Sequence, residues 1–111
     1  MTVRERVRDI QTELRERDVI PERARQVLVT LTALVGNCLD EIRVADAEYA
    51  AHLLHCLDTH AKANRARIEA KVSPQFARRQ IARDTRAVVI EMMRSLKVLL
   101  RSVEEEMRLT R

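Results

Sequence analysis

The residue types best able to do chemistry in this 111-residue sequence are three histidines and a cysteine that lie close together. Their spacing of three and four positions places neighbouring side chains on successive turns of one helix; they are His52, His55, Cys56 and His60. Imidazole and thiolate are zinc ligands, but the paired CxxC and HExxH patterns of complete zinc sites are absent. His52 and His60 are also too far apart to bind one ion jointly with Cys56. We therefore expect no metal and no cofactor, and His52, Cys56 and His60 are only weak candidates for a metal site.

Cys56 also has the spacing of a Cys–His nucleophile pair with His52 or His60, because residues four apart on a helix can touch. No orienting group or oxyanion hole can be identified beside it. A sequence with one glycine offers few strained loops on which to mount an active site. We predict that the protein is not an enzyme and that Cys56 packs as a small apolar side chain.

Basic residues form the second cluster of side chains that could do chemistry. Between Lys62 and Arg86, eight basic and two acidic residues give a net charge of +6, whereas the whole chain carries +4. Arg79, Arg83 and Arg86 are expected to share one outer ridge of a helix, where they would meet phosphates or an acidic partner surface. Few aromatic rings are available to stack on bases, so sequence-specific recognition is not expected. The predicted polyanion- or partner-binding residues, which we call the basic tip, are Lys62, Arg65, Arg67, Lys71, Arg78, Arg79, Arg83 and Arg86.

The elements that position these groups are predicted to be helices throughout. The sequence has one Gly, two Pro, one Tyr, one Phe and no Trp, whereas sheets need turn residues and favour aromatic and β-branched ones. The abundant residues, among them Ala, Leu, Arg and Glu, are strong helix formers. An all-α fold follows.

Cap residues divide the chain into three predicted helices. Thr2 and Glu5 have the spacing of a capping box, which starts a helix over residues 2–18. Pro21 suits the first turn of a second helix over residues 21–72, and Ser73 with Pro74 starts a third over residues 74–110. We expect one domain, residues 1–111, built as a long antiparallel helical hairpin or bundle. A break at Gly36 is the alternative, and it would give four helices.

The apolar positions of the second and third helices exceed what one antiparallel neighbour can bury. A second copy of the chain is the simplest cover, because twofold dimers are the commonest soluble oligomers. We therefore expect a homo-oligomer, with a dimer favoured. The predicted core and oligomer-interface residues are Leu28, Leu31, Val35, Cys38, Ile42, Ile81, Val88, Met92, Leu96, Leu99 and Val103.

Composition also bounds the location and the class of function. No stretch approaches the roughly 18 uncharged apolar residues of a membrane span, and the charged N-terminal residues do not resemble a signal peptide. Two cysteines are too few for a disulfide framework, so we expect no membrane and a cytoplasmic location. The predicted function is that of a non-enzymatic helical interaction protein: a self-associating scaffold, adaptor or assembly subunit with a protein partner. The alternative is nucleic-acid or other polyanion binding through the basic tip.

Overall fold

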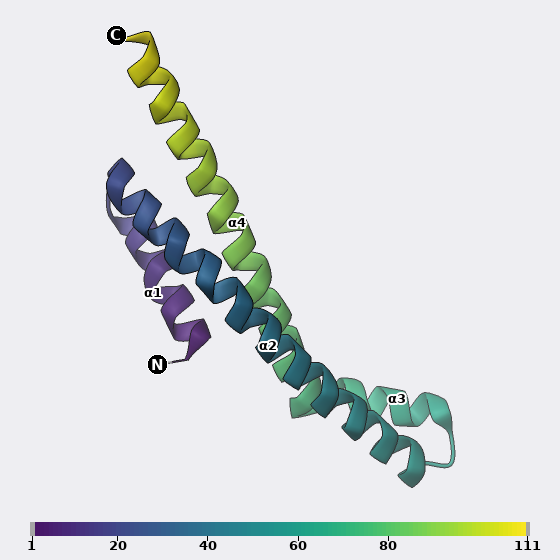
Figure 1. Cartoon of the computed structure of the whole chain (residues 1–111). Coiled ribbons are helices and arrows are strands. Elements are labelled where there is room, and N and C mark those ends of the chain that lie inside the picture. Colours follow the sequence, from purple (N-terminus) through teal and green to yellow (C-terminus); the bar gives the residue numbers. More distant parts are fainter. Residues whose placement is uncertain (1, 111) are drawn as a thin grey trace. The chain divides into compact units, whose positions relative to one another are not determined.

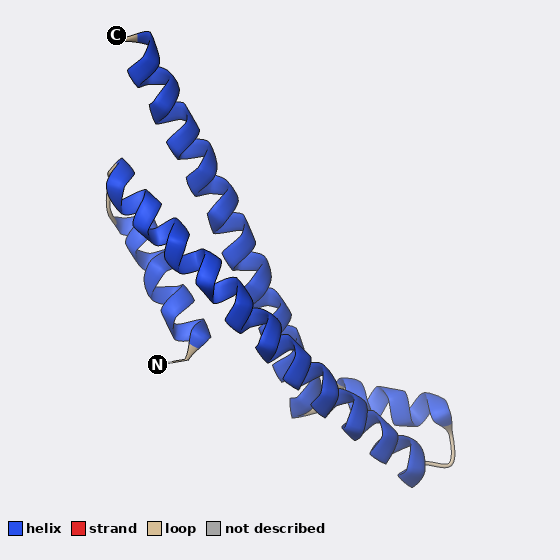
Figure 2. Cartoon of the chain, viewed as in Figure 1, coloured by secondary structure: helices blue, strands red, loops and turns tan. Residues whose placement is uncertain are grey.

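The computed structural model describes residues 2–110, and every regular element within them is a helix (Figures 1 and 2). The helices are α1 (Val3–Glu16), α2 (Pro21–Thr59), α3 (Ala63–Lys71) and α4 (Pro74–Leu109). The predicted all-α class is confirmed. Within the same residues, no helix combines the length and the apolar character that crossing a membrane requires.

Two of the predicted helix starts are formed by the expected caps. The Glu5 backbone N–H donates to Thr2 Oγ1 over 3.2 Å at the start of α1. At the start of α4, the Phe76 backbone N–H donates to Ser73 Oγ over 3.2 Å. Each cap satisfies an amide that the helix itself leaves without a partner, which is why these boundaries can be predicted from local sequence.

The single helix predicted over residues 21–72 is wrong, because α2 ends at Thr59 and α3 is a separate helix. The Thr59 hydroxyl donates to the carbonyl oxygens of His55 and Cys56, a side-chain interaction that competes with continued helix. Lys62 then adopts an extended backbone, and the chain turns back. The turn buries Ala66 and Ala70 against Cys56. The break therefore allows α3 to pack against the end of α2. The local periodicity of the sequence does not reveal this contact.

Gly36 does not interrupt α2, so the predicted alternative break is also wrong. Its backbone φ is not positive, and a Cβ added there would meet no atom within 4 Å. A glycine inside a helix costs only about 1 kcal/mol. Val27, Leu31 and Leu34 before it are buried and hold the helix in place.

Contacts divide the described chain into two compact units. Unit 1 contains residues 2–37 and 85–110, and unit 2 contains Cys38–Asp84. In unit 1, α1 and α4 both run antiparallel to α2, so α1 and α4 point in the same direction (Figure 1). In unit 2, the C-terminal part of α2 is followed by α3 and the start of α4. The organisation as one domain stays a prediction.

The core of unit 1 is a three-helix core. Its buried side chains recur at spacings of three and four, as expected of helix faces packed on one another; they are Val7, Ala24, Val27, Leu31, Leu34, Val89, Met92, Leu96 and Leu100. An ion pair joins α1 to α2 beside this core, because Arg23 donates to both carboxylate oxygens of Glu13 over 2.7 Å. Hydrogen bonding to Arg23 lowers the pKa of Glu13 below its ordinary value.

The predicted core and interface residues divide into three groups by burial. Leu31, Cys38, Met92 and Leu96 are buried. The half-buried ones are Leu28, Val35, Ile42, Val88 and Val103. Ile81 and Leu99, expected on the main apolar row of the last helix, are exposed at 39% each. That row instead passes through neighbouring positions, including Ala82, Val89 and Leu100.

Candidate interaction groove

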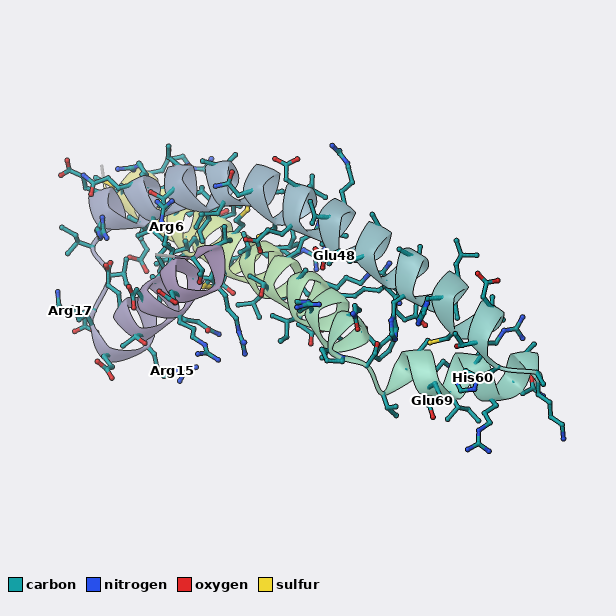
Figure 3. The ribbon with its side chains drawn as sticks, turned by 90° about the horizontal axis from the view of Figure 1, so that it is seen from below. Arg6, Arg15, Arg17, Glu48, His60 and Glu69 are labelled. Carbon is teal, nitrogen blue, oxygen red and sulfur yellow. The ribbon has the colours of Figure 1, made fainter. Side chains whose placement is uncertain are left out.

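Acidic side chains of α2 hold three arginines of the basic tip in unit 2. Arg79 Nε donates to Asp46 Oδ1 over 3.0 Å. Arg83 Nη2 donates to both carboxylate oxygens of Asp46, over 3.2 and 3.3 Å. Arg78 Nε lies 3.7 Å from Oε2 of Glu48, whose position on α2 is labelled in Figure 3. These arginines therefore connect α4 to α2.

The electrostatics of Asp46 support this connection. Burial raises the pKa of its carboxyl group, but hydrogen bonds from Arg79 and Arg83 outweigh burial, so the net pKa lies below the ordinary value. Arg79 also lies 5.0 Å from the centre of the Tyr49 ring, which in turn contacts the ring of Phe76 at 5.5 Å. The prediction of an outer ridge is thus wrong for Arg79 and Arg83, because both face α2.

The remaining basic residues of the tip are available at the surface. Lys62, Arg65, Arg67 and Lys71 belong to α3 and its N-cap. All four are exposed, and none forms an ion pair within residues 2–110. Arg86 is also exposed and belongs to unit 1. The free positive charge of unit 2 is therefore concentrated on α3.

Within the histidine and cysteine cluster, Cys56 is the packed side chain. Cys56 Sγ lies 3.5 Å from His52 Nε2, and Cys56 is buried against Ala66 and Ala70. His60, labelled in Figure 3, lies just beyond the end of α2. Nowhere in residues 2–110 do three His, Cys, Asp or Glu side chains gather in a way that could hold a metal ion. Cys38 and Cys56 are both buried, and no disulfide joins them.

Unit 1 contains an open groove between α1 and α4. Its apolar lining comes from Leu14 and Val19 on one side and, on α4, from Ala87, Val88, Met92, Leu96 and Leu99. Gln11, Arg15, Glu91 and Ser95 supply polar groups along it. The volume of about 590 Å³ lies within the range of binding pockets. The groove can therefore accept apolar side chains of a partner.

The groove exists because α1 is short and its apolar face is narrow. Of its 14 residues only Val7 is fully buried, while Leu14 is half-buried at the edge of the helix. Arg15 and Arg17 extend outward from the end of α1 (Figure 3). One side of α4 thus remains open where α1 does not cover it.

One wall of the groove is made of residues that the apolar row of α4 marks in the sequence, and the other wall is not marked in this way. Val88, Met92, Leu96 and Leu99 were predicted as core or interface residues, and all four line it. The wall from α1 and the following loop was not predicted. The only signal for it was Leu14, the last position of an apolar row that begins at Val3.

No known protein family, no characterised protein and no solved structure matches the chain. Over the residues that the structure describes, the fold and the site define the class: a small all-α protein with an apolar groove that has polar edges.

Proposed function

We propose that this protein is a non-enzymatic helical interaction protein that self-associates into a dimer through unit 1 and acts as a scaffold, adaptor or assembly subunit. The observation that carries the proposal is the groove between α1 and α4, which leaves Val88, Leu99 and Leu14 only partly covered. Apolar grooves with polar edges are the surfaces into which amphipathic helices dock.

The other chemical groups of the described chain support an interaction role over catalysis. Cys56 is buried against Ala66 and Ala70, and Asp46 is engaged by two arginines, so both side chains take part in contacts between helices. We propose the cytoplasm as the location, because two cysteines are too few for a disulfide framework.

Light scattering coupled to size exclusion tests self-association directly. We expect twice the 12.9 kDa chain mass at micromolar concentration. Leu99→Glu should weaken the dimer about a hundredfold, because an unpaired charge buried at an interface costs about 3 kcal/mol. Leu99 is 39% exposed, so the glutamate can be solvated in a folded monomer.

Val29→Glu is the matched control for Leu99→Glu, because Val29 lies in unit 1, is 72% exposed and does not line the groove. It should leave the dimer intact. A monomeric wild-type protein at micromolar concentration would refute the proposed function.

The second candidate function is polyanion binding through α3. The observation that favours it is the set of four exposed basic residues without ion pairs in the described chain: Lys62, Arg65, Arg67 and Lys71. Replacing all four with Glu should abolish binding to duplex DNA at low salt, with helicity retained. If wild-type binding exists, its salt slope should be about 0.9 for each phosphate contacted. Absence of binding to duplex DNA, single strands or RNA at low salt would exclude this candidate.

A further inference from the structure

The C-terminal end of α4 carries apolar side chains that the rest of residues 2–110 leaves exposed or only partly covered. Leu100 is the last buried residue of the helix, and within residues 101–110 only Val103 is even half-buried. Met107 is 58% exposed. Figure 1 shows these last turns of α4, which we call the bare end, running beyond the loop between α1 and α2.

The bare end continues an apolar row that begins inside unit 1. Met92 and Leu96 are buried, and Leu99, Val103 and Met107 follow at spacings of three and four. Such spacing keeps side chains on adjoining parts of one helix face. The same helix therefore carries both an open groove, at residues 87–99, and the largely exposed amphipathic segment of the bare end, at residues 101–109.

These two surfaces are complementary under a twofold axis. If two copies of α4 pair antiparallel with the axis near Lys97, Met107 of one copy lies opposite Ala87 of the other, and Val103 lies opposite Glu91. The bare end of each copy then occupies the groove of its partner, and the contact is made twice. Twofold symmetry thus covers both uncovered surfaces at once and closes the assembly as a dimer.

Charge supports the same alignment. The bare end carries Glu104, Glu105 and Glu106, which are exposed and form no ion pair within the described residues. Because α1 and α4 run in the same direction in unit 1 (Figure 1), the N-terminal side of α1 lies toward the start of the groove on α4. Arg8 precedes the lining residues Gln11 and Arg15 on one row of α1, so it continues that row by one turn toward this end. Arg8 is also exposed and without an ion pair in the described chain. In the antiparallel alignment Glu106 reaches this end of the partner's groove.

We infer that the occupant of the groove is the bare end of α4 from a second copy of this chain, with Met107 and Val103 as its apolar anchors and Glu106 beside Arg8 of the partner. The inference rests on the proposed function. It adds which segment fills the groove, that the two copies of α4 pair antiparallel, and which charges meet at the contact.

Met107→Glu tests the apolar anchor. The variant should raise the dimer dissociation constant about tenfold or more with unchanged circular dichroism, because each dimer loses two buried methionines while the exposed position tolerates Glu in the monomer. Val29→Glu adds the same charge away from the groove and should leave the constant unchanged. A wild-type dimer that Met107→Glu does not weaken overturns this inference and leaves the proposed self-association standing. A monomeric wild type refutes both.

A charge exchange tests the direction of pairing. Arg8→Glu and Glu106→Arg should each raise the dissociation constant, because each places like charges together at both ends of the twofold contact. The double variant Arg8→Glu/Glu106→Arg restores opposite charges and should bring the constant back toward the wild-type value. Sedimentation equilibrium at low salt measures all three. A double variant that dimerises no better than the weaker single variant contradicts the antiparallel arrangement.

Discussion

Replacing Leu31 with alanine should lower the free energy of unfolding by about 2–5 kcal/mol, the usual cost of leaving a cavity in a core. Leu31 has no exposed surface and is the largest of the fully buried side chains, together with Leu34. It lies on the face of α2 that packs in the core of unit 1. Urea denaturation followed by circular dichroism at 222 nm measures the loss.

Val29→Ala is the control for Leu31→Ala, because it shortens an apolar side chain two residues away on the same helix. Two residues correspond to more than half a turn, and Val29 is 72% exposed on the opposite side of α2. Its effect on the free energy of unfolding should stay within about 0.5 kcal/mol. Equal losses for the two variants would contradict the placement of Leu31 in the core.

Local signals predicted those parts of the fold that local interactions determine. Thr2 and Ser73 accept hydrogen bonds from the backbone N–H groups of Glu5 and Phe76. These caps need only residues three positions apart, so the local sequence predicts them. Composition was enough for the all-α class, because it removes the residues that sheets and tight turns need. Leu31, Met92 and Leu96 were also found, since they lie at the centre of their apolar rows.

The parts that were missed depend on which segments meet in three dimensions. Ala66 and Ala70 are too small to stand out in a hydrophobic pattern, yet both are fully buried and fix the position of α3. Arg79 and Arg83 count as surface charge in the sequence, and only the folded chain brings them to Asp46, more than 30 positions earlier. A net charge can be read from a sequence, but its neutralisation by a distant carboxylate cannot.

The groove also depends on which segments meet in the folded chain. Periodicity predicts that α4 has more apolar surface than one neighbour covers, and it places Val88 and Leu99 on the main apolar row. Both residues line the groove. Periodicity does not show that α1 approaches α4 and forms the second wall with Leu14 and Val19. The chain reverses direction between α1 and α2 and again after α2. These two reversals set the direction of α1 relative to α4, and local sequence patterns do not contain them.

Replacing Ala66 with leucine should displace α3 and lower the free energy of unfolding by about 1–3 kcal/mol, because an overpacked core must shift side chains or backbone. Ala66 has no exposed surface and packs, with Ala70, on Cys56 and on the half-buried side chains of Tyr49 and Leu53.

The matched control is Ala63→Leu, at the first and exposed position of the same helix. Alanine and leucine have similar helix propensities, so a difference between the two variants reports packing. Hydrogen exchange should show faster exchange of the α3 amides in Ala66→Leu and wild-type rates in Ala63→Leu. If Ala66→Leu kept wild-type protection throughout α3, then α3 would not be held by these two alanines, and the reason given for the end of α2 at Thr59 would fail with it.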